Sequence, residues 1–233
     1  MALVALPLVG SGSTWLTLTV AGLAMGTIVF IVASGLTLVF GLMDVLNLGH
    51  GVFLALGAYV AVSSFGAMAG YAASPSLAMN LVAVFAAIGI AMLAAGALGL
   101  AFERVVVKPV YGHHLKQILI TMGGMIVGEE LIKLVWGPVP IALPLPETLR
   151  GSFVIGEAIV EKFRVLATVI GAVVFVVLAW VLARTKLGLL IRAGVENREM
   201  VEALGYRIER LFVGVFVAGS ALAGLGGVLW GLY

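Results

Sequence analysis

Long runs of hydrophobic residues alternate with short polar segments along the chain. A helix that crosses the hydrocarbon core of a bilayer needs about 20 mostly apolar residues, and these runs have that length. Because lipid offers the backbone no hydrogen-bond partners, we expect each run to be helical. The runs also lack the period-two alternation of a transmembrane β-strand. The pattern predicts an all-α, polytopic transmembrane helix bundle with about six spans, at residues 14–41, 50–66, 79–102, 117–136, 163–183 and 211–232.

Polar residues and glycines interrupt this pattern between the first two runs, where a continuous lipid-facing helix would not place them. The interruption is either a turn at the membrane surface or a re-entrant segment, and the sequence leaves both open. Polar side chains inside a membrane protein are candidate functional groups. Asn47 and His50 are therefore candidates to line a translocation pathway, with helix capping at the interface as the alternative role. The interrupting residues are Asp44, Asn47, Gly49, His50 and Gly51.

Small residues recur at every fourth position on two of the predicted helices. Such stripes let helix backbones approach closely inside a membrane. We expect them to pack within one bundle, although a contact with a second membrane subunit would use the same pattern. The stripes are Ala83, Ala87, Ala91, Ala95 and Gly99 on one helix, and Gly219, Ala223, Gly227 and Gly231 on the other.

The composition agrees with a membrane location. Of 233 residues, 63% are hydrophobic and 10% are charged, and the mean hydropathy is +1.23. A soluble domain carries about 25% charged residues, so soluble enzymes, nucleic-acid-binding proteins and disordered proteins are disfavoured. The lack of cysteine excludes disulfides, thiolate metal sites and a cysteine nucleophile. The sequence contains no GxxxxGKS/T motif, so the chain does not hydrolyse ATP through a P-loop, and we expect no cofactor or metal.

Basic residues are concentrated in two segments, residues 103–116 and 184–210, which together hold nine of the thirteen Lys and Arg residues. Two predicted spans separate these segments, so both lie on the same side of the membrane. Basic loops favour the cytoplasmic side. We therefore expect both segments in the cytoplasm. By parity the N-terminus lies outside, provided that the region around Asp44 is a turn.

The second basic segment contains a short amphipathic helix. Asn197 can cap its start, Glu199 near the start suits the helix dipole, and Gly205 can end it in a left-handed conformation. The helix is too short and too polar to span a membrane, so it is either a solvated connector or a docking helix for a cytosolic partner. The candidate docking residues are an apolar face of Met200, Val201 and Leu204, together with Arg192, Asn197, Arg198, Glu199, Glu202 and Gly205.

Residues 137–162 form the predicted extracytoplasmic loop, which begins with four of the seven prolines. After the prolines, the sequence predicts a short hairpin that turns near Gly156. The loop is either an ordinary ordered connection or a platform for an extracytoplasmic partner.

Four stretches of the sequence are similar to a known family of membrane proteins. SGLTLVFGLMDVLNLGHGVFLALGAYVA, residues 34–61, resembles the signature of the LIV-type permeases, the membrane subunits of ABC importers for branched-chain amino acids. ERVVVKPVYG at 103–112 and LIKLVWGP at 131–138 resemble the family's first cytoplasmic connector and the end of its next span. LGLLIRAGVENREMVEALGYRIERL at 187–211 resembles the loop that contacts the ATPase. The resemblance covers nearly the whole chain in order and is closer to the shorter of the two paired permeases.

The resemblance implies one transmembrane permease domain over residues 1–233, about two helices short at the C-terminus relative to the family. The implied partners are a second permease subunit, two cytosolic ATPase subunits, an extracytoplasmic substrate-binding protein and membrane lipid. The substrate would be a branched-chain amino acid or a related small polar solute such as urea or a short amide. The chain itself would not be an enzyme, and it would lie in a bacterial or archaeal cytoplasmic membrane.

The alternative function is a stand-alone secondary transporter or channel. Such a protein needs a self-contained pathway, which is usually built from internal inverted repeats. The sequence contains only a faint similarity between VASGLTLVFGL and VAGSALAGLGGVL. A membrane scaffold without transport activity is a further alternative.

Overall fold

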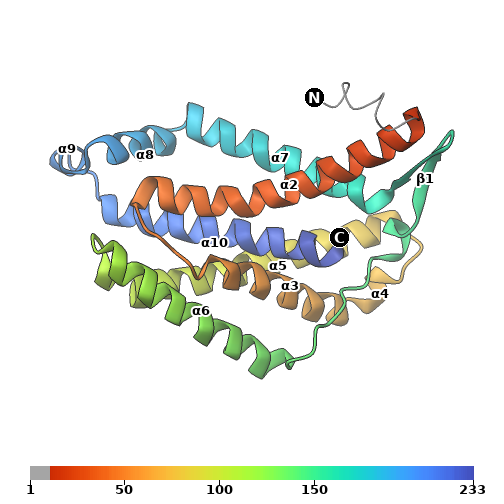
Figure 1. The fold of residues 1–233 in the computed structure, drawn as a ribbon, viewed down its shortest axis with the longest axis horizontal. Helices are drawn as coiled ribbons and strands as arrows, with labels where there is room; N and C mark the ends of the chain where they lie inside the picture. Colours follow the sequence, from red (N-terminus) through yellow and green to blue (C-terminus); the bar gives the residue numbers. More distant parts are fainter. Residues whose placement is uncertain (1–10) are drawn as a thin grey trace.

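The computed structural model describes residues 11–233 and all of their side chains except those of Leu42 and Arg198. The fold is an elongated bundle in which six long helices run along the same general direction (Figure 1). One long helix corresponds to each predicted span, which confirms the all-α prediction. These helices are α2 (Gly12–Met43), α3 (His50–Ala67), α5 (Leu77–Phe102), α6 (His114–Trp136), α7 (Lys162–Arg184) and α10 (Ile208–Leu232).

Five of the six long helices are long and apolar enough to cross a membrane, and α6 is the exception. With 23 residues α6 is long enough, at about 34 Å, to cross a hydrocarbon core of about 30 Å. It is less apolar because Glu129, Glu130 and Lys133 lie in its second half. A membrane crossing by α6 therefore stays a prediction, whereas length and composition support the other five.

Short elements connect the long helices. Gly156, with φ of +64°, turns an antiparallel hairpin in which Ile155 pairs with Ala158, as the sequence predicts. The short elements are α4 (Ala69–Ala72), the π-helical turn η2 (Glu103–Val107), the 3₁₀ turns η3 (Lys108–Val110) and η4 (Glu147–Leu149), the strands β1 (Ser152–Ile155) and β2 (Ala158–Glu161), and the helices α8 (Lys186–Glu196) and α9 (Arg198–Ala203).

Helix α10 occupies the centre of the bundle, where it contacts α2, α3 and α5. Glycines make these contacts possible: a Cβ atom added at Gly57 of α3 would overlap the backbone of Gly224, and one added at Gly227 would overlap the backbone of Leu54. Gly219 meets Gly35 of α2 in the same way. The stripe of small residues on α10 therefore packs within the bundle, as expected, because small residues allow close backbone contact.

The two basic segments lie at one end of the bundle, together with α8 and α9 (Figure 1). Lys108 Nζ of the first segment lies 3.4 Å from Glu209 Oε2 of the second. The β1–β2 hairpin lies at the opposite end, where the backbone amide of Ile159 donates to Thr17 Oγ1 at 3.3 Å, near the start of α2. We call these the basic end and the hairpin end. The prediction that both basic segments share one side is confirmed, and their cytoplasmic location stays a prediction.

Because the natural chain has no cysteine, single cysteines can test the orientation directly. Glu157→Cys, in the hairpin turn, should react with a membrane-impermeant maleimide in intact spheroplasts. His113→Cys and Glu196→Cys, at the basic end, should react only after the membrane is permeabilised. The reverse labelling pattern would show that the basic end faces outward.

The glycine contacts of α3 predict a difference between two substitutions of the same kind. Gly57→Ala should lower the stability by about 1–3 kcal/mol, because the added methyl group forces α3 away from α10. Gly66→Ala, on the same helix and with open space at its Cβ position, should leave stability unchanged or raise it by up to about 1 kcal/mol. Thermal unfolding in detergent, followed by tryptophan fluorescence, measures both. Equal melting temperatures for the two variants would contradict the close contact.

Candidate functional site

The chain reverses direction at the end of α2. Asp44 follows the last helical residue with φ of 52°, and it is the one non-glycine residue with a positive φ among residues 11–233. Asp and Asn tolerate this left-handed conformation better than most other residues. The reversal directs the next residues back along α2 instead of away from the bundle.

The segment after Asp44 re-enters the bundle before α3 begins. His50 Nε2, at the start of α3, lies 3.2 Å from the carbonyl oxygen of Val32. Val32 lies eleven residues before the end of α2 at Met43, so α3 begins about 16 Å back along α2. Figure 1 shows this connector running from the end of α2 to an α3 that starts inside the bundle. The chain therefore turns at the exposed Asp44 and then re-enters the bundle, so the break combines a turn with an inward return.

Side chains of α6 take the place of regular backbone hydrogen bonds along the re-entrant segment. The Leu46 amide donates to Gln117 Oε1 at 3.4 Å, and the Leu48 amide donates to Thr121 Oγ1 at 3.2 Å. Gln117 and Thr121 lie one turn apart on α6 and are 1% and 0% exposed. The sequence analysis did not identify these two residues. The only indication of their role in the sequence was that two polar residues stand four positions apart at the start of an apolar run.

Asn47 and His50, the predicted pathway residues, are buried at the junction of the re-entrant segment with α3. They are 4% and 6% exposed. Asn47 Oδ1 accepts from the Gly49 amide at 3.0 Å, and Asn47 Nδ2 has no partner. His50 Nδ1 is also without a partner. Gly49 is the N-cap residue of α3, and no side chain caps that helix, so simple helix capping does not account for Asn47 and His50.

Aromatic rings lie close to this junction. The ring of Phe53 makes edge-to-face contacts with His50, Phe102 and Phe216, with centroid distances of 6.1, 5.7 and 6.0 Å. The ring of His50, with its unpaired Nδ1, is thus held against the apolar ring of Phe53. Buried polar groups are nearly always paired in proteins, so two unpaired atoms at one junction need an explanation.

At the basic end, the predicted cap and stop signals of the amphipathic helix are confirmed. Asn197 Oδ1 accepts from the Met200 amide at 2.9 Å at the start of α9, and Gly205 has φ of +87° just after its end. Glu199 lies in the first turn. A second short helix, α8, precedes α9, and Thr185 caps it by accepting from the Gly188 amide at 3.3 Å.

The predicted apolar face of α9 is wrong for one residue, Val201. Val201 is 4% exposed and packs inward in the same buried cluster as Ile208 and Phe212, whereas Met200 and Leu204 are 63% and 70% exposed. The helix ends at Ala203, so Leu204 does not continue its face. Successive residues of a helix point about 100° apart, so α9 can turn Val201 toward the bundle while Met200 stays exposed.

The remaining predicted docking residues differ in their surroundings. The guanidinium of Arg192 donates to the carbonyl oxygen of Leu182 at 3.0 Å, which ties α8 to the end of α7. Glu199 and Glu202 are exposed. Arg198 begins α9, and its side chain lies outside the described part of the structure.

Large apolar side chains are exposed along both α8 and α9, over a wider area than the sequence predicts. Each of them is more than half exposed. We call this set the basic-end patch: Leu187, Leu189, Val195, Met200, Leu204 and Tyr206.

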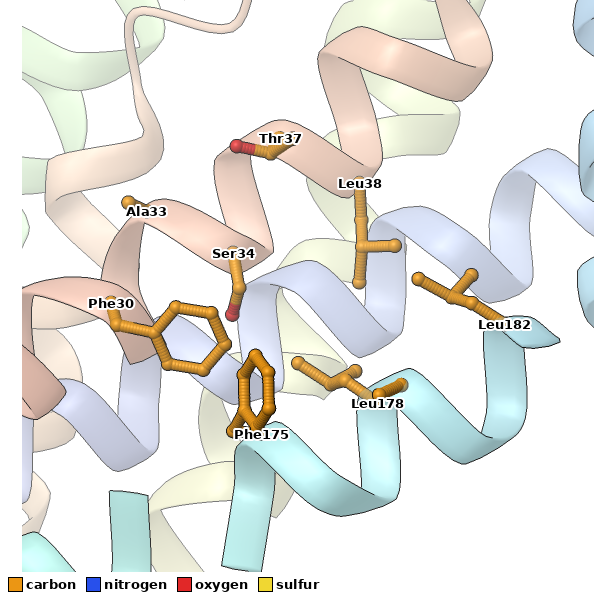
Figure 2. Close-up of a pocket in the computed structure, with 9 residues that line it drawn as sticks. Phe30, Ala33, Ser34, Thr37, Leu38, Phe175, Leu178 and Leu182 are labelled. Atoms are coloured by element: carbon orange, nitrogen blue, oxygen red, sulfur yellow. The ribbon is translucent and has the colours of Figure 1, made fainter. Parts of the chain in front are cut away.

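A groove of about 320 Å³ lies between α2 and α7 (Figure 2). The rings of Phe30 and Phe175 meet across it at 5.6 Å, with Leu178 and Leu182 beside them. The Ser34 hydroxyl already donates to the carbonyl oxygen of Ile31 at 2.8 Å. This apolar lining suits a lipid chain or another helix better than a polar solute.

Comparison with known proteins gives the same family as the sequence resemblance. Residues 18–233 match the family described as branched-chain amino acid transport system / permease component. BraD of Pseudomonas aeruginosa is 28% identical over 219 residues, which cover 91% of this chain and 69% of that protein. LivH of Salmonella typhimurium is 29% identical, and LivH of Escherichia coli 28% identical, each with the same coverage. All three are named high-affinity branched-chain amino acid transport system permease proteins. No solved structure matches the chain significantly.

The family model covers more than nine-tenths of the chain and includes every long helix except the first turns of α2. The proteins in this comparison are transport components and not enzymes. Five apolar helices and these relatives make this a multi-pass membrane protein. The chain belongs to the family of permease components of branched-chain amino acid transport systems.

Proposed function

We propose that this chain is the permease subunit of an ATP-driven importer for branched-chain amino acids or related small polar solutes. Its single transmembrane domain would form part of the translocation pathway in a bacterial cytoplasmic membrane. A second permease subunit would complete the pathway, and two cytosolic ATPase subunits would hydrolyse ATP. An extracytoplasmic binding protein would deliver the solute. Family membership and the named relatives support this proposal.

The basic-end patch is the observation that carries the coupling part of the proposal. Its six large side chains are exposed at the end of the bundle that is rich in charge. Exposed apolar patches of this kind mark protein interfaces. An apolar helix face rimmed by charges is suited to a groove on a partner protein, and Glu199 and Glu202 would form such a rim.

The attachment of α8 to the bundle explains how a docked ATPase could move the membrane helices. A Cβ atom added at Gly188 would overlap the backbone of Leu182, and Arg192 donates to the same Leu182 carbonyl group at 3.0 Å. Helix α8 therefore sits tightly against the end of α7. A displacement of α8 by closing ATPase subunits would pass to α7, and from α7 to α2, which it contacts along the groove.

The hairpin end offers a separate contact surface for the binding protein. Phe153, Val154, Ile155 and Ile159 of the β1–β2 hairpin are each at least half exposed. The hydrogen bond from Ile159 to Thr17 holds the hairpin against α2. A contact there would act on the end of α2 that lies opposite the basic end.

We also propose that Asn47 and His50 line the pathway. A broken helix inside a membrane bundle places backbone and side-chain polar groups where a solute can use them. A stand-alone secondary transporter would also use such a break.

The docking role predicts a strong effect of a charge within the basic-end patch. Leu204→Asp should abolish co-purification of the ATPase subunits and solute uptake, with membrane insertion unchanged. Truncation of a buried interface anchor typically costs more than about 1 kcal/mol, and a buried charge costs more than a truncation. Glu202→Ala, at the rim, should cause only a partial loss. Normal ATPase binding by Leu204→Asp would show that α9 is not the coupling element.

The hairpin surface predicts the complementary defect. Val154→Asp changes a side chain that is 73% exposed at the other end of the bundle, so it serves as the matched control for Leu204→Asp. It should leave ATPase co-purification intact and reduce, by severalfold, the stimulation of ATP hydrolysis by the loaded binding protein. Unchanged stimulation would leave the hairpin as an ordinary connection.

A further inference from the structure

Helix α3 begins inside the bundle, and of its first amide groups that of Gly49 donates to Asn47 Oδ1 and that of Val52 to the Gly49 carbonyl oxygen, which leaves those of His50 and Gly51. The first amide groups of a helix have no acceptor within the helix, and together they carry a partial positive charge. No side chain caps α3, which is 18 residues long. The start of α3 therefore presents the amides of the buried His50 and the exposed Gly51, with positive potential, at a place where an anionic group of a ligand would be stabilised.

The Asn47 side chain independently points to a ligand at the same place. Its Oδ1 accepts from the Gly49 amide at 3.0 Å, which fixes the orientation of the side-chain amide and places it beside the start of α3. Nδ2 is then a donor, and it is buried without an acceptor in a residue that is 4% exposed. A buried donor without an acceptor is costly, and an acceptor supplied by a ligand would remove that cost.

His50 provides a hydrogen-bond acceptor in addition to the Asn47 Nδ2 donor. Because its Nε2 lies 3.2 Å from the Val32 carbonyl oxygen, which can only accept, Nε2 carries the hydrogen. In the neutral ring Nδ1 is then an acceptor, and it is buried without a partner. An unpaired donor and an unpaired acceptor thus lie three residues apart at one helix start.

We propose that the start of α3, with Asn47 Nδ2, binds the carboxylate of the transported amino acid, and that His50 Nδ1 accepts from its ammonium group. This inference rests on the proposed function and names the chemical groups that the pathway recognises. Carboxylate and ammonium are common to all amino acids, so this site would accept any of them and leave the choice of side chain to other groups.

Helix α6 closes the site and is the element suited to open it. Gly124 meets the Phe102 ring, Gly128 meets Val52, and Gln117 and Thr121 bond to the re-entrant segment. Apart from Ile132, the remaining residues of α6 are not buried. Separating α6 from this segment breaks two side-chain hydrogen bonds, and an entering solute or water can replace them.

The test uses the permease with its ATPase subunits in lipid nanodiscs, without the binding protein, so that only the pathway selects the ligand. Binding of radiolabelled L-leucine is competed with L-leucinamide, which lacks the carboxylate, and with 4-methylpentanoate, which lacks the ammonium group. The wild type should bind L-leucine at least about tenfold more tightly than L-leucinamide, the scale of one charge-assisted hydrogen bond.

Asn47→Asp replaces the donor with a negatively charged acceptor of the same shape. It should weaken L-leucine binding by at least about tenfold and weaken L-leucinamide binding less, so that the preference disappears or reverses. A misfolded variant would lose both ligands and would not retain its ATPase subunits. Thr168→Val removes a hydroxyl that bonds to the Arg164 carbonyl oxygen within α7, away from the re-entrant segment, and it should leave the preference unchanged.

Wild-type uptake with the binding protein separates this inference from the proposed function. If neither the branched-chain amino acids nor a related small polar solute such as urea or a short amide is taken up, the proposed function fails. If uptake occurs but leucine and leucinamide bind equally well, or if Asn47→Asp binds leucine as the wild type does, the carboxylate site is overturned and the proposed function stands.

Discussion

A stretch of chain that is not helical can lie inside a membrane bundle only if other groups accept and donate its backbone hydrogen bonds. Residues 44–49 are such a stretch, and Gln117 and Thr121 of α6 supply partners for two of its amides, those of Leu46 and Leu48. These side-chain hydrogen bonds from α6 allow α3 to begin inside the bundle. Without it, the amides of Leu46 and Leu48 would be buried and unpaired, and the chain would have to reverse at the membrane surface instead.

Close helix packing supports the same arrangement from the other side. Gly57 and Leu54 of α3 meet Gly224 and Gly227 of α10, so the buried side of α3 lies almost backbone to backbone on the central helix. Contacts of this kind depend on dispersion forces over many atoms, because helices gain no hydrophobic free energy from one another in lipid. One face of α3 is therefore rigid, while its other face meets the less tightly held α6. This asymmetry is suited to a pathway that must open on one side only.

Most of the fold could be predicted from the sequence because long apolar runs identify membrane helices. The helix cap at Asn197 and the helix end at Gly205 could also be predicted, since each depends only on residues within four or five positions of it in the sequence. Gln117 and Thr121 were not, because their partners lie more than 70 residues earlier in the chain. The inward direction of Val201 depends on how α9 is seated on α10, and the sequence of a six-residue helix does not specify this. For the same reason, Asn47 and His50 were recognised as candidates without any indication of what they contact.

The modest apolarity of α6 affects how the protein is assembled. A helix with Glu129, Glu130 and Lys133 in its second half partitions weakly into lipid when it is alone. Its inner face becomes favourable only when it meets Val52, Phe102 and the backbone of the re-entrant segment, all of which precede it in the chain. During synthesis, the earlier helices must therefore already be in place to receive α6. If α6 crosses the membrane, its insertion is a step of tertiary folding, and defects in α3 or α5 would first appear as a failure to integrate α6.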